Sequence, residues 1–416
     1  MEVGGTRLNR QTVVRRLHRD SPPGQEGCPQ DGVVDRRLCE KAERWGVFSR
    51  VSIDHPVPPG HPSWTGGEFK SPVFLGVVLS IVLLLATTLP AAAQFGDETR
   101  DVTRGGTTAA EFLSIPVGAR ATAMGSAFTA SVDDATSLYW NPAGLGGMQN
   151  ATFAAEYAEW LVGIDFNYVA VVMPTSLGTF GLGVTVLRTP DMEVTTIEEQ
   201  NGTGETFDAA SYAFSISYGR ALTDKFSVGG SAKLITERIW NSQATGLALD
   251  VGTVFVTPFR GIRLGASISN FGTKMQIGGD DLLVVVDIDP NNRGNNESNR
   301  AELRTDKFDL PLTMRIGLAG EVFQSEEARL TLAVDALSPN NSDQYVNVGA
   351  ELGLLGDLLM LRGGYTELFL EDSARSFTLG GGLRYDFASL GFALDYAYEN
   401  MDFFNSVNRF TLAVQF

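Results

Sequence analysis

The chain has 416 residues, of which 43% are hydrophobic and 19% are charged, and its formal net charge is −17. This acidity excludes nucleic acid as an expected partner, because a phosphate backbone is repelled by a negatively charged surface. All cysteines and histidines, namely His18, Cys28, Cys39, His55 and His61, stand near the start of the chain. The rest of the chain lacks the side chains for thiol catalysis, Ser-His-Asp triads and Cys/His zinc sites, so we expect no enzyme, no metal site and no cofactor.

The first recognisable element is an uncharged apolar run at residues 73–89. Lys70 precedes this run, and three alanines at 91–93 followed by Gln94 come after it. A basic flank, a short apolar core and small residues at the cleavage positions are typical of a secretory signal peptide. We therefore expect residues 70–93 to be a signal peptide. A single transmembrane helix is the alternative, but a run of about 17 residues is marginal for spanning a bilayer.

Residues 1–69 stand before this signal and are rich in proline, arginine and aspartate without apolar periodicity. Because a signal peptide should begin the chain, we interpret residues 1–69 as a mis-assigned start, with a disordered extension as the alternative. Cleavage after residue 93 would leave 21 Lys and Arg against 40 Asp and Glu, a net charge of −19.

Residues 94–150 do not alternate in hydrophobicity, and small side chains dominate from 107 to 148. Asp133 and Asp134 could cap a short helix that continues through Trp140, and Pro142 with Gly144 would stop it. A compact segment with small side chains can fill the interior of a barrel. We predict that 94–150 is a hatch inside the structure that the following strands form.

From residue 151 to the end, stretches of about ten residues alternate between apolar and small or polar residues. For example, Phe377, Leu379 and Leu383 alternate with Thr378 and Gly382. A period of two places each set on one face of a strand. We count 14 strands, which begin near Ala151, Gly163, Gly178, Ser211, Phe226, Ala244, Gly261, Phe308, Ala328, Gln344, Leu358, Ser376, Leu390 and Asn408.

The lengths of these strands and connections indicate a membrane protein. The strands are close to the roughly 9–11 residues that a tilted membrane strand needs, whereas soluble strands average about five or six. Tight turns such as 174–177 alternate with long loops such as 189–210 and 272–307. Short periplasmic turns, long external loops and an even strand number are typical of bacterial outer-membrane barrels. We predict an all-β fold, a transmembrane antiparallel β-barrel at 151–416 whose apolar side chains face the outer-membrane lipids.

Glycines inside the predicted strands, at 181, 183 and 380–382, are expected to relieve crowding or to bend the wall. The last strand alternates and ends on an aromatic residue. We predict that it carries the signal read by the barrel-insertion machinery, formed by Phe410, Leu412, Val414 and Phe416.

The second long loop contains an apolar run, Leu282, Leu283, Val284, Val285 and Val286. This run could capture an apolar ligand or add a strand to a partner; a loop hairpin or an extension of the wall is the alternative. Asp287, Asp289 and Asn291 follow with the spacing of calcium ligands, but the Gly and the terminal Glu of an EF-hand loop are missing, so we predict no metal site there.

The predicted hatch resembles the N-terminal signature of the PorV/PorQ family of outer-membrane proteins. The residues that carry the resemblance are Gly118, Ala119, Arg120, Met124, Gly125, Asp133, Asp134, Tyr139, Trp140, Asn141, Pro142, Ala143 and Gly144. The Asn-Pro-Ala element is also similar to that of FadL, the long-chain fatty-acid transporter. The resemblance extends over 105–416 and implies a fourteen-stranded barrel with an N-terminal hatch. Within it, Arg120 is expected to pair with a lumen carboxylate such as Asp395 or Glu399.

The resemblance to PorV/PorQ implies an accessory role in type IX-like protein secretion, in which the barrel handles cargo proteins that carry C-terminal sorting domains. The alternative is a FadL-like channel for passive uptake of hydrophobic small molecules. A structural barrel without transport of its own is a third possibility.

Overall fold

The computed structural model describes residues 104–289, 291, 298–371, 373–404 and 406–416. All of them belong to one compact unit, Glu98–Phe416. The predicted extension at 1–69 and signal peptide at 70–93 lie outside the described residues. In the described part, no helix has the length and apolarity needed to cross a membrane, a finding that does not bear on crossing by strands.

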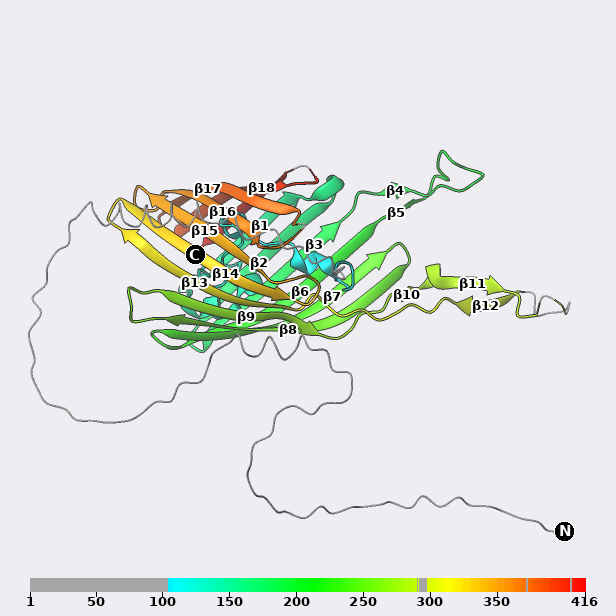
Figure 1. The fold of residues 1–416 in the computed structure, drawn as a ribbon, viewed down its shortest axis with the longest axis horizontal. Helices are drawn as coiled ribbons and strands as arrows, with labels where there is room; N and C mark the ends of the chain where they lie inside the picture. The colour runs from blue at the N-terminus through cyan, green and yellow to red at the C-terminus, as the bar shows by residue number, and fades with distance from the viewer. Residues whose placement is uncertain (1–103, 290, 292–297, 372, 405) are drawn as a thin grey trace, which may run out of the picture. The chain divides into compact units, whose positions relative to one another are not determined.

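Fourteen long antiparallel strands close into a barrel (Figure 1). Their order around the barrel is β8-β7-β6-β3-β2-β1-β19-β18-β17-β16-β15-β14-β13-β9, and β9 pairs again with β8. Their bounds are β1 (Thr152–Glu159), β2 (Asp165–Thr175), β3 (Gly178–Arg188), β6 (Ala209–Thr223), β7 (Phe226–Ile239), β8 (Ser242–Val256), β9 (Arg263–Gly272), β13 (Thr313–Gln324), β14 (Ala328–Pro339), β15 (Tyr345–Leu354), β16 (Leu359–Leu368), β17 (Arg375–Phe387), β18 (Leu390–Met401) and β19 (Val407–Gln415). The first and last strands pair from Thr152↔Gln415 to Glu159↔Asn408, so the C-terminal strand closes the barrel.

The predicted fold class and strand number are confirmed, and the starts of all strands but β13 lie within two residues of the prediction. The predicted start of β13 at Phe308 is wrong. Phe308 instead forms an isolated bridge with Met275, and the ladder to β9 and β14 begins only at Thr313. Pro311 has no N–H to donate to a ladder, which explains the late start. Leu310, an apolar residue of the same run, is buried.

The two faces of the strands separate by polarity as the period of two predicts. On β17, Leu379 is 53% exposed on the outside of the barrel, whereas its neighbour Thr378 is fully buried in the lumen. The same contrast holds on β13, where Ile316 is exposed and Arg315 is buried. An apolar exterior around a closed sheet requires lipid, so this is a transmembrane barrel of the kind found in bacterial outer membranes.

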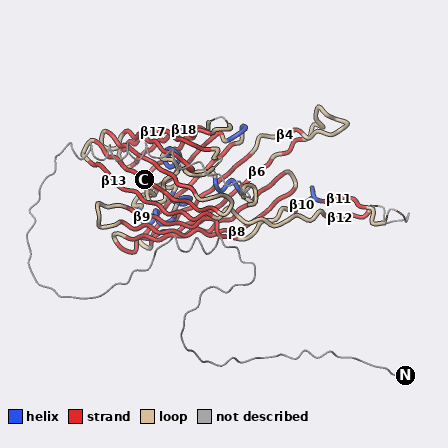
Figure 2. Tube along the Cα trace, in the orientation of Figure 1, coloured by secondary structure: helices blue, strands red, loops and turns tan. Residues whose placement is uncertain are grey.

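The two ends of the barrel differ. We call the end with the turns β2–β3, β6–β7 and β17–β18 the short-turn end, and the opposite end the long-loop end. At the long-loop end two hairpins project past the barrel strands (Figure 2). The minor elements there are β4 (Met192–Glu193), β5 (Thr206–Phe207), β10 (Gly278–Gly279), β11 (Leu283–Val286), β12 (Asn299–Glu302) and the 3-10 turns η3 (Leu161–Gly163) and η4 (Asp280–Leu282).

Residues 104–150 form the hatch, which runs through the lumen from one end to the other. It begins at the long-loop end, where Thr108 bridges Asp309, and it joins β1 at the short-turn end. Its short helices are η1 (Glu111–Ser114), α3 (Ala119–Ala123), α4 (Ser137–Trp140) and η2 (Pro142–Gly147).

Wall glycines let the hatch backbone touch the strands. A Cβ at Gly349 of β15 would overlap the carbonyl of Met124, and one at Gly181 of β3 would lie 2.9 Å from the Leu138 side chain. Gly380 similarly faces Ala123. The glycines at residues 181, 183 and 380 were expected to relieve crowding, and the crowding group is the hatch. The hatch can pack closely against the wall there because these positions have no side chain.

We predict that Gly349→Ala destabilises the protein by about 1–3 kcal/mol, because the added methyl group forces the hatch away from β15. The measurement is the free energy of unfolding in urea, with the barrel held in lipid vesicles. Gly363→Ala on β16 is the matched control, since its Cβ would meet nothing closer than 3.7 Å. Equal stability of the two variants would contradict this packing.

Candidate functional site

Backbone N–H groups of the hatch donate to side chains of the wall. The amide of Gly118 donates to Glu156 on β1 over 2.6 Å, and the amide of Ala119 donates to Thr411 on β19 over 2.8 Å. Gly125, in the left-handed region at φ 63°, donates to Thr378 on β17 over 3.0 Å. Because these donors are buried, each bond offsets a desolvation cost that would otherwise favour a displaced hatch.

Arg120 attaches the hatch to the wall by charge. Its Nε lies 2.8 Å from Glu351 on β15, and its Nη1 contacts Asp133 and, at 3.3 Å, Asp134 within the hatch. The predicted partners Asp395 and Glu399 are wrong.

Arginines of β16 and β17 already neutralise those two carboxylates of β18. Asp395 pairs with Arg362 at 2.6 Å, and Glu399 pairs with Arg375 at 2.5 Å. Arg120 therefore pairs with the carboxylate of Glu351 on β15 and with the carboxylates of the hatch itself.

The buried network extends around one half of the lumen wall. Glu351 accepts from three guanidinium groups, those of Arg120, Arg329 and Arg362. Further along, Arg409 on β19 joins Glu156 at 3.2 Å and Glu399 at 3.5 Å. A buried charge without its partners costs several kcal/mol, so this half of the wall holds a fixed arrangement of charges.

The residues of the hatch signature cross-link the hatch to itself. Asp134 accepts from the amide and hydroxyl of Thr136, one residue before α4, so the helix begins later than the Asp133–Asp134 pair suggested. Trp140 Nε1 donates to the Val117 carbonyl over 2.7 Å, and Asn141 Nδ2 donates to the Thr129 carbonyl over 2.9 Å.

Asn141 also fixes the start of the next turn. Its Oδ1 accepts from the Ala143 amide, and its Nδ2 also reaches the Thr253 carbonyl on β8. Pro142 begins η2, and Gly144 packs against Val132 and Ser137 where a Cβ would not fit. The functional role of these residues stays a prediction.

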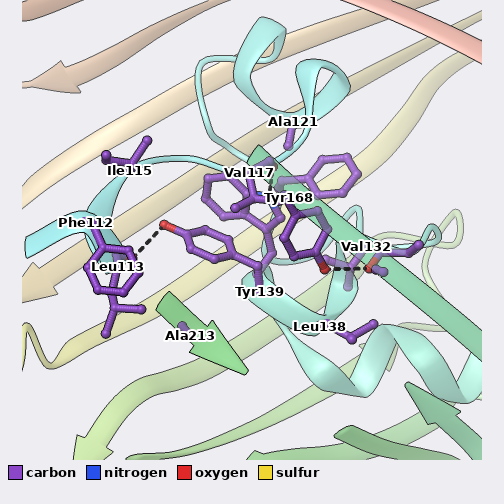
Figure 3. Packing of buried hydrophobic residues seen from close by; sticks show 14 of the residues in the cluster. Phe112, Leu113, Ile115, Val117, Ala121, Val132, Leu138, Tyr139, Tyr168 and Ala213 are labelled. Atoms are coloured by element: carbon purple, nitrogen blue, oxygen red, sulfur yellow. Dashed lines mark hydrogen bonds between the residues drawn. The ribbon is translucent and has the colours of Figure 1, made fainter. Parts of the chain in front are cut away.

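The other half of the lumen contains an apolar seam, which we define by Leu113, Leu138, Tyr139, Tyr168 and Ala213 (Figure 3). Tyr139 donates its hydroxyl to the Leu113 carbonyl, which holds the start of the hatch against α4. A small cavity of about 20 Å³ lies between these side chains and those of Thr185, Ser215 and Lys233. Within the described residues, no hydrogen bond joins the hatch to β3 or β6.

A larger cavity of about 520 Å³, which we call the short-turn cavity, lies at the short-turn end. The hatch residues Gly118, Arg120 and 133–136 form one side of it, and the ends of β15–β19 and β1 form the other. Its charged side chains are Arg120, Asp133, Asp134, Asp357, Arg384, Asp386 and Asp395. Its volume is within the range of ligand-binding cavities.

The apolar run predicted as an external contact forms the hairpin β11–β12, with Leu282 in η4. Its role as a contact for a ligand or a partner stays a prediction. Val285 is 69% exposed there. Asp287 and Asp289 accept from the amides two residues onward, as in Asx turns. Among the described residues, no group of three or more His, Cys, Asp or Glu side chains has the arrangement of a metal site.

At the long-loop end, hydrogen bonds from Arg238 hold the pKa of the Asp208 carboxyl below its usual value. Arg188 adds a second ion pair at 3.2 Å. The carboxyl therefore stays ionised in mildly acidic medium and keeps the loop between β3 and β6 tied to β7.

The C-terminal residues lie on β19 and just after it. Phe410 and Leu412 point outward and are exposed, Val414 is half-buried, and Phe416 donates its amide to the Ala151 carbonyl. Their recognition by the insertion machinery stays a prediction.

Sequence reasoning missed the charged half of the wall and the unpaired Arg384. The available signal was a set of charged residues at inward positions of the period of two, such as Arg362, Glu399 and Arg409. The pairing itself depends on which inward positions of different strands meet, and the hydrophobic pattern does not specify that.

We predict that Glu351→Gln lowers the free energy of unfolding by about 3–5 kcal/mol, because it leaves three buried guanidinium groups short of a counter-charge. Lys274→Ala is the control: it removes the exposed pair with Asp309 and should cost less than about 1 kcal/mol. Urea titrations of both variants give the comparison, and a small effect of Glu351→Gln would mean that the network contributes little to stability.

Comparison with solved structures gives several barrels of low sequence identity. The Pseudomonas putida toluene transporter TodX is 14% identical, with 72% of this chain and 97% of that chain covered and a TM-score of 0.47. The CymD monoaromatic hydrocarbon channel is 13% identical over 72% and 97%, with a TM-score of 0.45. A Pseudomonas aeruginosa FadL homologue is 12% identical over 70% and 96%, with a TM-score of 0.42. The fold assignment rests on the strand pairing of this chain.

None of the curated proteins matches the chain. The family described as "Uncharacterised protein family (UPF0164)" matches residues 86–306, which include the whole hatch and the first half of the barrel. This match covers more than half of the chain. The chain therefore belongs to the uncharacterised protein family UPF0164.

Proposed function

We propose that this barrel allows passive uptake of small apolar solutes across the outer membrane, and that the solutes pass along the apolar seam. The observation that carries the proposal is the absence of any hydrogen bond between the hatch and β3 or β6 in the described part of the chain, where the boundary consists of Leu138, Tyr139 and their apolar neighbours.

The unequal attachment of the hatch supports this route. On β1, β15, β17 and β19 the hatch is held by Glu156, Glu351, Thr378 and Thr411, through an ion pair or buried hydrogen bonds. Moving it there would expose unpaired buried polar groups at a cost of about 1–3 kcal/mol each. Along β3 and β6, a departing Leu138 leaves the glycines at 181 and 183 and a mostly apolar surface that also carries the Ser215 hydroxyl, and it breaks no hydrogen bond between the hatch and these strands.

An apolar solute can replace the contacts that the hatch loses along the seam. Burial of apolar surface is non-directional, so the solute's own surface compensates for the separation of Leu138 from the wall. A polar solute would have to give up its water and would gain few partners there, because Lys233 is already paired with Asp250 and the seam is otherwise bordered by the hydroxyls of Thr185 and Ser215. The seam is therefore selective for apolar compounds without a preformed pore.

We predict that Leu138→Ala increases uptake of the apolar dye 1-N-phenylnaphthylamine severalfold in Gram-negative cells that express the barrel, because the substitution widens the seam. The measurement is the rate at which dye fluorescence rises after addition. Met124→Ala is the matched control, since it truncates another fully buried hatch residue, whose backbone contacts β15 and not β3. If the two variants accelerate uptake equally, or if neither does, the seam is not the route.

A role in protein secretion is a second proposal, favoured by the two hairpins at the long-loop end. They carry exposed apolar side chains, with Ile197 92% and Ile288 72% exposed, as a surface for cargo would require. In the native host, removal of residues 283–302 should then leave proteins with C-terminal sorting domains in the periplasm. Normal surface delivery would exclude this role.

A further inference from the structure

The short-turn cavity is lined by an arginine, Arg384, that forms no ion pair with a described residue. Four of its five carboxylates have an arginine partner: Asp133 and Asp134 pair with Arg120, Asp357 with Arg329 at 3.4 Å, and Asp395 with Arg362 at 2.6 Å. The fifth, Asp386, is exposed near the end of β17. Because Asp133 and Asp134 share one arginine, the lining carries more carboxylates than arginines, and Arg384 is its arginine without an ion pair among the described residues.

Arg384 is the exception among the arginines that line this cavity. It points inward from β17 and is half-buried, yet its guanidinium makes no hydrogen bond or ion pair with any described residue; only its backbone amide is bonded, to the Leu358 carbonyl. Arg120 repels the guanidinium charge of Arg384, and the carboxylates of Asp133, Glu351 and Asp395 attract it without forming an ion pair. A half-buried cation near a like charge gains from binding an anion.

The rest of the lining provides an apolar surface beside this charge. Ala154, Ala393 and Ala413 project inward from three neighbouring strands, and Leu358 lies in the adjacent turn. Ala393 is the residue directly opposite Arg384 in the register of β17 and β18. Small side chains at these positions account for the open volume, which is large enough for a ring of six atoms with a substituent.

We propose that the short-turn cavity is a binding site for small organic anions, with a carboxylate or phosphate held by Arg384 and an apolar body resting on the alanines. Guanidinium matches both groups because it donates two parallel hydrogen bonds to a planar or tetrahedral anion. The site is separate from the apolar seam, and binding there does not require a solute to pass the hatch.

The proposal is tested by ¹⁹F NMR titration of the purified, folded barrel in uncharged detergent with 4-fluorobenzoate as the probe. We expect saturable binding, and Arg384→Gln should raise the Kd about 10- to 100-fold, the effect of losing hydrogen bonds to a charged group. A titration with 4-fluorophenyl phosphate then shows which anion the site prefers, because the probe with the lower Kd carries the preferred group. 4-Fluorobenzyl alcohol, of nearly the same shape but neutral, should bind more weakly and respond little to the substitution.

Two further variants complete the test. Arg220→Gln removes an exposed arginine at the same end of β6 but outside the lumen, and it should leave the Kd unchanged. Ala393→Leu keeps the charge and narrows the cavity beside Arg384, so it should weaken binding even if Arg384→Gln fails to fold. Unchanged affinity in both Arg384→Gln and Ala393→Leu, or equal affinity of the wild type for the acid and the alcohol, would overturn the proposal.

Discussion

The close approach of the hatch to wall positions that lack a side chain is the constraint on which the rest of the structure depends. Gly349, Gly364 and Gly380 lie where Met124, Gly125 and Ala123 press against the strands, and on the opposite side Gly229 and Gly252 receive Pro142 and Asn141. Because backbone meets backbone, buried amides of the hatch can reach wall side chains such as Thr378. The hatch packs closely against the wall because its side chains are small and because the strands have glycines at the points of contact.

The lumen is divided by chemistry, and the division determines what the hatch can do. On the strands from β14 to β19 and on β1, arginines and carboxylates form a network that fixes the hatch through Arg120 and Glu156. On β2, β3 and β6 the boundary is mostly apolar, with Tyr168 donating to the Ala135 carbonyl as its polar contact. The hatch is therefore attached by polar contacts to the charged strands, and also to β7, β8 and β9 through Ala110, Asn141 and Trp140, whereas apolar packing holds it along β3 and β6. The two kinds of contact have different costs of separation.

The strands were predictable because turns and a period of two act locally. The tight turns at 174–177 and 387–389 fix where β2 and β17 end and where β3 and β18 begin, whatever the rest of the barrel does. The start of β13 was not predictable, because Phe308 and Leu310 continue the alternation while Pro311 and contacts with Met275 interrupt the ladder.

The contacts across the lumen could not be predicted from the sequence. The pairing of Arg120 with Glu351, and the isolation of Arg384, depend on the stagger of the strands and the rotation of the hatch, which the hydrophobic pattern leaves open.

The central claim is that the hatch, held against wall glycines, closes the lumen. The most direct measurement is the ionic current through single purified barrels in a planar lipid bilayer, compared with a variant that lacks residues 107–148. We predict no steady current for the complete protein and a large, constant conductance for the variant. A steady conductance of the complete protein, equal to that of the variant, would contradict the account.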